Sequence, residues 1–274
     1  MVTEAKKPNK WAVEPFLRFQ KYLEESGRIL VLSMKGLGQI ARMPPLAEAL
    51  AYFEREEGAP DIPTEEERQR LEQVREDARF AEVEEEQGFP RLHAHAVVDV
   101  WSALEVLRED LVVAWLVNVP ESLSNPEVAK IRLPISETEA TEKEDRMRLV
   151  CRELERNLKT NERLGVNRIE VLLSVVGLPG KEIPEEVKRN IFEMQQIRNT
   201  IVHKGSIADK RLADKRLVEA CPWLGLAPGA IIRVTHEDYG RYVRSVGDYV
   251  LGLINRARAQ LGLPPVPDSP AAST

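Results

Sequence analysis

The chain has 274 residues, of which 43% are hydrophobic, 31% charged and 5% aromatic. This length can bury a sizeable core in one large or two smaller domains, and the few aromatic residues favour helices over a β-sandwich. The formal charge of −6 argues against a general nucleic-acid coat protein but leaves room for a local basic site. We therefore expect an all-α protein.

The apolar runs and the cysteines indicate the cellular compartment of such a protein. The longest apolar run, residues 111–117, is far too short to cross a bilayer, and the first residues contain no signal-peptide stretch. We therefore expect a cytoplasmic protein without membrane contact. Cys151 and Cys221 are too few for a disulfide framework, so we expect both to be reduced thiols in the core.

Residues 1–90 predict an N-terminal helical extension with helices over 11–34, 46–57 and 64–86. Thr64 is an N-cap residue type, and the three glutamates that follow it favour the positive end of the helix dipole. Apolar residues of this third helix share one side, so its many charges more readily form a solvated face than an acidic contact surface.

Residues 91–262 predict a more regular helical domain. Its first helix, 93–117, is apolar nearly all round and should be central. Glu105 follows Trp101 by one turn on an apolar stripe, so its carboxylate needs a cationic partner. Further helices are expected over 137–160, 168–176, 184–202, 209–220 and 235–261.

The boundaries of this domain are also predicted. Thr235 should cap the last helix together with Asp238, three residues on. At most one short β-element is expected, near 230–234. Residues 263–274 are rich in proline and small residues and are expected to form a disordered tail.

The helix over 184–202 combines an apolar stripe with a guanidinium. At about 100° per residue, Arg198 falls on that stripe, where the pattern predicts burial. The other members of the stripe are Val187, Ile191, Met194 and Ile201. Asn199 and His203 share another, more polar face, whose neighbours are Phe192, Gln195 and Gln196.

Arg198, Asn199 and His203 suit phosphate chemistry. A histidine with a pKa of about 6.5 can exchange a proton with an attacking hydroxyl or a leaving oxygen, and an arginine can hold a phosphate as charge builds. Asn199 can orient either group. Arg198 and His203 stand about 140° apart on an ideal helix, so they converge on one ligand at the helix terminus or through a second chain.

A basic segment surrounds these residues. Residues 188–216 contain eight basic and three acidic side chains, although the whole chain is acidic. Ordinary ion pairs on a helix surface explain the same residues equally well. As candidate RNA contacts we take Lys188, Arg189, Lys204, Lys210 and Arg211.

At these positions the chain resembles the HEPN superfamily of helical domains, over roughly residues 94–260. Its nuclease members carry an arginine, a polar residue, a few further residues and a histidine, which the run Arg198-Asn199-Thr200-Ile201-Val202-His203 matches. Residues 94–116 (AHAVVDVWSALEVLREDLVVAWL) look like the first core helix, with its acidic position at Glu105.

This resemblance implies a HEPN-like antiparallel helical bundle and a homodimer that brings two Arg/His pairs into one cleft. It implies RNA cleavage without a metal or other cofactor, in which a 2′-hydroxyl attacks the adjacent phosphate and leaves a 2′,3′-cyclic phosphate. A toxin–antitoxin or antiphage role, with an antitoxin or regulatory protein as partner, also follows. Gly205 stands where toxins paired with nucleotidyltransferases often carry a modified tyrosine, so we expect no such modification.

Two alternatives stay open. A non-catalytic HEPN module would bind RNA, a nucleotide or a protein partner through the same cleft. A helical scaffold would instead bury Arg198 against Glu105, with His203 merely capping its helix. The other histidines, His93, His95 and His236, are expected at helix surfaces rather than in a metal site.

Overall fold

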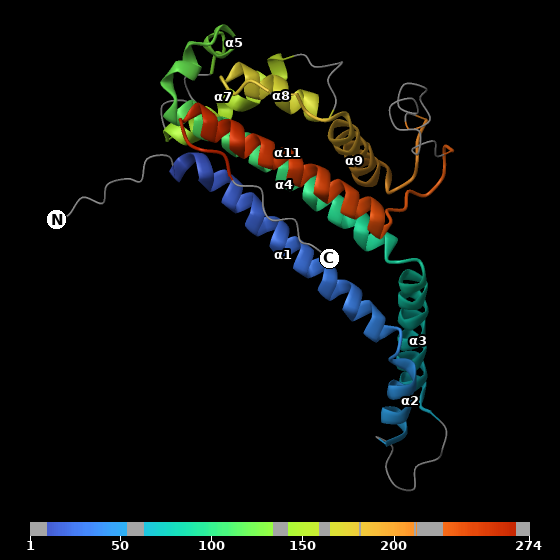
Figure 1. The fold of residues 1–274 in the computed structure, drawn as a ribbon. Helices are drawn as coiled ribbons and strands as arrows, with labels where there is room; N and C mark the ends of the chain where they lie inside the picture. Colours follow the sequence, from blue (N-terminus) through green and yellow to red (C-terminus); the bar gives the residue numbers. More distant parts are fainter. Residues whose placement is uncertain are drawn as a thin grey trace, which may run out of the picture. The chain divides into compact units, whose positions relative to one another are not determined.

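The computed structural model describes residues 10–53, 63–133, 142–158, 165–180, 182–210, 212 and 227–266 (Figure 1). Across these residues the regular structure is helical, which confirms the predicted all-α fold. The β-element expected near 230–234 is reduced to one antiparallel bridge between Ile207 and Ile231. No helix among the described residues is both long and apolar enough to span a lipid bilayer.

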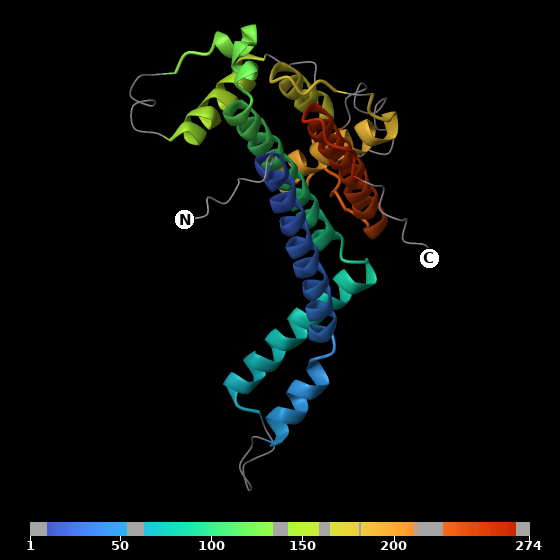
Figure 2. The ribbon, with the colours of Figure 1, turned by 60° about the vertical axis from the view of Figure 1, so that its left-hand side comes forward.

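The chain forms two compact units. The larger unit comprises Met1–Leu23, Val97–Ile232 and Gly240–Thr274, and the smaller comprises Glu24–Ala96 and Arg233–Tyr239. Three long helices, drawn in blue, green and red in Figure 2, are α1 (Lys10–Ile40), α4 (Pro90–Asn118) and α11 (His236–Gln260). Each of them contributes residues to both units. The limits predicted from the sequence, 1–90, 91–262 and 263–274, stay predictions, and residues 267–274 lie outside the described residues.

Helix α4 supplies the core of the larger unit, as its apolar pattern predicts. Its fully buried side chains include Leu104, Leu107 and Leu111. The same helix carries charges, and these are paired with neighbouring helices. Asp110 accepts from Arg18 of α1 at 3.0 Å and from Arg148 of α7 (Lys143–Asn157) at 2.9 Å. Because Asp110 is buried, these two contacts fix α1 and α7 against α4.

The other helices of the larger unit are α8 (Val166–Val175) and α9 (Glu185–Lys204). A buried polar network joins α9 to α11. The Arg241 guanidinium donates to Glu193 Oε2 at 2.8 Å and to Asn190 Oδ1 at 2.7 Å, while the Asn190 amide donates to Ser245 Oγ at 2.9 Å. Glu193 is 2% exposed, so Arg241 compensates a carboxylate that is out of contact with water.

Several predicted helices have different ends in the structure. Helix α1 continues six residues past the predicted end, because the helix passes through Gly36 and Gly38 without a break. The 137–160 prediction corresponds to α7, and its remaining residues, except Glu142 and Leu158, lie outside the described ones. Of the helix predicted over 209–220, Lys210 and Leu212 lie in turns and 213–220 fall outside the described residues. A 3₁₀ turn (Pro120–Ser124) and the short α5 (Pro126–Ala129) were not predicted.

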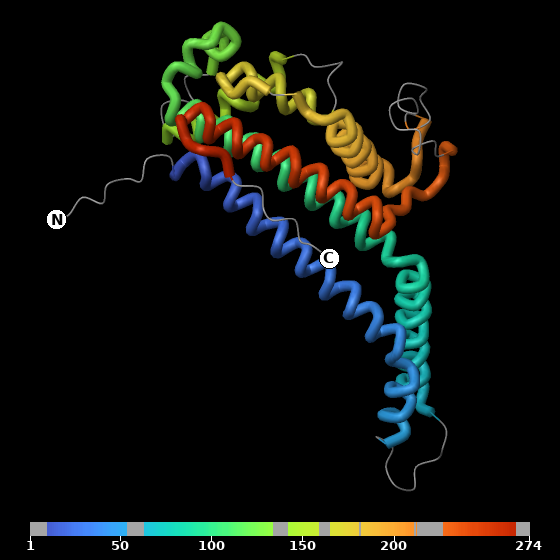
Figure 3. The backbone as a smooth tube through the Cα atoms, viewed as in Figure 1, coloured from blue at the N-terminus to red at the C-terminus, as the bar shows by residue number. Residues whose placement is uncertain are grey.

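In the smaller unit, α2 (Pro44–Phe53) packs against α3 (Glu65–Glu86), as the backbone trace in Figure 3 also shows. An ion pair between Arg75 and Glu48 joins these helices at 2.8 Å, and Arg42, in the turn before α2, pairs with Glu85 of α3 at 3.0 Å. At the start of α3 the Thr64 side chain accepts from the backbone N–H of Glu67, and the Glu67 carboxylate accepts from the backbone N–H of Thr64. The predicted cap is therefore confirmed.

The prediction for His93 was wrong, because this side chain is 1% exposed. Its Nδ1 lies 3.0 Å from the carbonyl oxygen of Phe89, which can only accept, so Nδ1 carries the proton. Nε2 therefore accepts, and it lies 3.2 Å from Nδ1 of His236 at the start of α11. The Tyr239 ring also packs on His93, with 5.6 Å between the ring centroids.

This arrangement makes the smaller unit sensitive to acid. Burial lowers the pKa of His93, and the neighbouring His236 lowers it further despite the opposing contact with Phe89. The folded state then binds fewer protons than the unfolded state, so stability falls as the pH drops below about 6.5, the pKa of an unfolded histidine. His93→Gln should flatten this part of the stability–pH curve between pH 7.5 and pH 5, as measured by urea unfolding. The exposed His95→Gln is the matched control, and equal slopes in both variants would contradict the prediction.

Candidate functional site

The candidate site lies at the end of α9. The helix stops at Gly205, which adopts the left-handed conformation (φ 59°) and donates its N–H to the carbonyl of Thr200. His203 and Lys204 occupy the last turn, where positive charge suits the helix dipole. The helix predicted over 184–202 thus continues to Lys204, which places His203 in its last turn.

Arg198 is held nearly two turns before that terminus. Its Nη2 lies 3.5 Å from Glu105 Oε2 on α4, and its Nη1 donates to Asn199 Oδ1 at 3.1 Å. The Nε atom is buried and has no partner among the described residues. The Arg198 side chain as a whole stays 23% exposed and that of Glu105 38% exposed. The guanidinium is therefore fixed by two neighbours while part of it still meets solvent.

Glu105 is less buried than the apolar pattern of α4 predicts, so its charge costs less free energy. A carboxylate that is 38% exposed retains much of its hydration, so its pairing with Arg198 is not forced by full burial. The expectation of a cationic partner is confirmed nevertheless. The pair orients Arg198 more than it stabilises the fold.

His203 is exposed and forms no hydrogen bond or ion pair with the described residues. No contact joins it to Arg198 in the part of the chain that the structure describes. This agrees with the angular separation expected on one helix, and it leaves the imidazole open to a ligand. The structure thus brings together Arg198, Asn199 and Glu105 but leaves His203 apart from them.

The candidate RNA contacts lie at two places, one near the start of α9 and one near its end. Lys188 is bound to Glu185 at 2.5 Å near the helix start, and Arg189 follows it. With a rise of about 1.5 Å per residue, Lys188 lies roughly 22 Å from His203 along the helix axis. Lys204 and Lys210 are exposed at the His203 end, and Arg211 lies outside the described residues.

Gln195, which the sequence places near the polar face of Asn199 and His203, is not open to solvent. This side chain is 9% exposed, and its Oε1 accepts from the backbone N–H of Gly165 at 2.8 Å. Gly165 has φ 63°, and a Cβ there would come within 3.2 Å of the Phe192 backbone. The face of α9 that includes Phe192 therefore packs against the start of α8 rather than solvent.

A second cluster, which the sequence analysis missed, joins α8 to α11. The Glu170 carboxylate accepts two hydrogen bonds from Arg256 and one from the hydroxyl of Tyr249, all at 2.6 Å. Burial and the Glu170 charge raise the pKa of Tyr249 well above its usual value, so the phenol stays a donor. Burial alone would lower the pKa of Arg256, but Glu170 outweighs it and raises that pKa.

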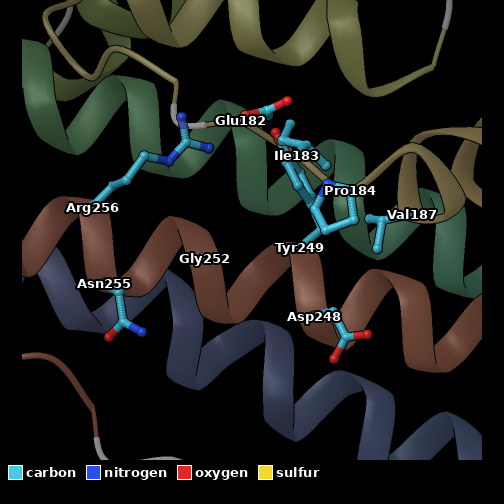
Figure 4. Close-up of a pocket in the computed structure, with 9 residues that line it drawn as sticks. All are labelled: Glu182, Ile183, Pro184, Val187, Asp248, Tyr249, Gly252, Asn255 and Arg256. Atoms are coloured by element: carbon cyan, nitrogen blue, oxygen red, sulfur yellow. The ribbon is translucent and has the colours of Figure 1, made fainter.

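A cavity of about 370 Å³ opens beside this cluster, between α11 and the loop that leads into α9 (Figure 4). Its walls are mainly Ile183, Pro184, Val187 and Tyr249, and Arg256 reaches across one end toward Glu182. Because Arg256 already donates two hydrogen bonds to Glu170, this cavity offers a ligand mostly apolar contact. We therefore do not place the chemistry here.

Among the described residues, neither a reactive cysteine nor a metal-binding cluster accompanies the site. Cys151 is fully buried, and burial raises the pKa of its thiol to about 12, which makes it a poor nucleophile. Cys221 lies outside the described residues. Within the described ranges, no three His, Cys, Asp or Glu side chains lie close enough together to hold a metal ion.

No protein-family model, curated protein or solved structure matches the chain. The likeness to HEPN nucleases therefore depends on the Arg198–His203 motif and on the α4 pattern. The fold and the site together define an all-α protein in which Arg198, Asn199 and Glu105 form a cluster. The exposed His203 follows Asn199 by about one turn of the same helix.

A substitution at Gly180 tests how firmly the hydrogen bonds of the second cluster hold Glu170. A Cβ at this position would overlap Glu170 Oε2 and lie 3.4 Å from Arg256 Nη1. Glu170 is held by three hydrogen bonds and cannot move aside freely, so Gly180→Ala should lower the free energy of unfolding by about 1–3 kcal/mol. In the matched control, Gly252→Ala, the new methyl meets nothing within 4 Å, and helix propensity should raise stability by up to about 1 kcal/mol. Urea unfolding distinguishes them, and a rise in both would contradict the prediction.

Proposed function

We propose that this protein is a metal-independent endoribonuclease of the HEPN type that acts as a homodimer. The observation that carries the proposal is the placement of Arg198, which Glu105 and Asn199 orient while 23% of its side chain stays exposed. The exposed His203 follows at the capped end of the same helix. An oriented arginine and an unengaged histidine are the two groups that this reaction needs.

The reaction is a transfer within the RNA backbone. A 2′-hydroxyl loses its proton and attacks the adjacent phosphorus, and the bond to the 5′-oxygen breaks as that oxygen takes up a proton. His203 exchanges these protons, and the Arg198 guanidinium binds the phosphoryl oxygens as their charge grows. Asn199 keeps the guanidinium in position through its side-chain oxygen. The products are a 2′,3′-cyclic phosphate and a free 5′-hydroxyl.

Two chains fit this chemistry better than one. Arg198 leans toward α4, whereas His203 is exposed and contacts neither Arg198 nor Glu105. A two-fold axis near the end of α9 would let Arg198 of each chain face His203 of the other. Lys204 and Lys210 are exposed at this end and would neutralise RNA phosphates, while Lys188 and Arg189 would contact RNA only farther along.

A non-catalytic module is the second candidate function. The observation that favours it is the ion pair itself, because Glu105 already neutralises part of the Arg198 charge at 3.5 Å. Such a module would bind RNA, a nucleotide or a protein partner without cleaving. For either function we propose a cytoplasmic protein of a toxin–antitoxin or antiphage system, with an antitoxin or regulatory protein as a further partner.

The first test is cleavage. Purified protein should cut single-stranded RNA in the presence of EDTA and leave 2′,3′-cyclic phosphate ends, detected by their resistance to phosphatase. His203→Ala and Arg198→Ala should each lower the rate at least about 100-fold, because each removes a group that acts in the transition state. His95→Ala, a control at another exposed histidine, should cut normally. RNA binding without cleavage by the wild-type protein would favour the non-catalytic module instead.

The second test asks whether two chains build the site. When the inactive His203→Ala and Arg198→Ala proteins are mixed and allowed to exchange subunits, each mixed dimer retains one intact arginine and one intact histidine. Cleavage should return to at most about a quarter of the wild-type rate, since half of the dimers are mixed. If the active wild-type enzyme uses a site within one chain, the mixture stays inactive, which would contradict the composite site.

A further inference from the structure

The smaller unit exposes an unusual share of large apolar side chains. Of 18 exposed large hydrophobic residues among the described ones, 11 belong to this unit, which contains less than a third of the chain. Scattered exposed apolar residues are normal on a protein surface, whereas a concentration of them indicates an interaction site.

Four of these side chains form a continuous stripe that begins at Met43, directly before α2, and continues along the helix. Met43, Leu46, Leu50 and Phe53 follow one another at spacings of three, four and three residues, and this spacing places the three helical ones on one face of α2. They are 39%, 52%, 48% and 79% exposed, in that order. We call these four residues the α2 stripe. Ala51 is the buried residue of α2, so the helix turns its larger apolar side chains away from the core.

The stripe belongs to a helix that is already fixed in place. The Arg75–Glu48 ion pair joins α2 to α3, and the Arg42–Glu85 pair joins the turn just before α2 to α3. A partner therefore meets a preformed helix pair with an apolar row along it, which is the arrangement that receives a further amphipathic helix. Since the helix pair is preorganised, binding costs little ordering entropy.

Charge decides which partner fits. The smaller unit contains 19 acidic and 10 basic residues, a formal charge of −9, while the larger unit contains 26 acidic and 29 basic residues. Two copies of the smaller unit would repel each other, and RNA would be repelled as well. A partner helix with basic residues beside its apolar face would instead be attracted to the acidic smaller unit.

From the α2 stripe and this charge we infer that the smaller unit is a docking site for an amphipathic helix of a partner protein that flanks its apolar face with lysine or arginine. The site is separate from the residues proposed for RNA cleavage. It accounts for an acidic, apolar surface that the ribonuclease proposal does not use.

The test uses two fluorescent peptides of about three heptads, with leucine at the a and d positions and lysine at the others, or glutamate in the second peptide. Anisotropy should show that the full-length protein binds the lysine peptide and not the glutamate peptide. Raising the salt from about 50 mM to about 300 mM should weaken binding.

Two double variants localise that binding. Leu46→Ser with Leu50→Ser should weaken it about tenfold, equivalent to about 1.4 kcal/mol. Leu17→Ser with Val106→Ser removes two equally exposed apolar residues of the larger unit and should leave binding unchanged. Thermal unfolding followed by circular dichroism checks that both variants fold.

Three results would overturn the proposal. Equal binding of the lysine and glutamate peptides would remove the charge argument, and equal effects of the two double variants would remove the α2 stripe. Sedimentation that shows a wild-type dimer, and a monomer for Leu46→Ser with Leu50→Ser, would assign the stripe to a second copy of this chain. None of these results depends on whether the protein cleaves RNA.

Discussion

Paired charges on α4 govern the arrangement of the larger unit. This helix buries Leu104, Leu107 and Leu111, yet the same stretch carries three carboxylates. Asp110 pairs with α1 and α7, Glu109 lies 3.6 Å from Arg148 of α7, and Glu105 reaches α9. An unpaired charge on a buried helix costs several kcal/mol, roughly 3–5 kcal/mol when one partner is lost, whereas apolar contacts tolerate small shifts. The arginines therefore specify where each neighbouring helix lies along α4.

The candidate site uses the most exposed of these three carboxylates, so its ion pair serves mainly to orient the arginine. Arg198 Nη2 faces Glu105 on α4, and Asn199 accepts a hydrogen bond from the other terminal nitrogen of the guanidinium, Nη1. The ion pair thereby preorganises the arginine, as a functional group needs supporting contacts to stay in place. His203 has no comparable support, because it is exposed and forms no hydrogen bond or ion pair with the described residues. The two residues of the motif thus differ in how firmly the fold holds them.

Local signals in the sequence predicted much of the fold and part of the site. The caps at Thr64 and at Thr235, whose hydroxyl accepts from the Asp238 N–H at 3.0 Å, involve residues three positions apart, so the sequence displays them directly. The Glu105–Arg198 pair could be predicted because each residue interrupts an apolar stripe. Glu170 and Arg256 give no such signal, since they are 86 positions apart and each resembles an ordinary surface charge. His93 was misjudged for the same reason, because its partner His236 lies 143 positions away.

The distribution of charge links the site to the rest of the chain. An overall charge of −6 suggests a protein that avoids nucleic acid, yet it combines a smaller unit at −9 with a larger unit that is weakly basic. Attraction of RNA phosphates falls off within about 10 Å at ordinary ionic strength, so the local charge near α9 matters more than the total. The charge of the smaller unit therefore does not by itself argue against the RNA binding proposed for the larger unit. Net charge alone would not have pointed to the function proposed for the end of α9.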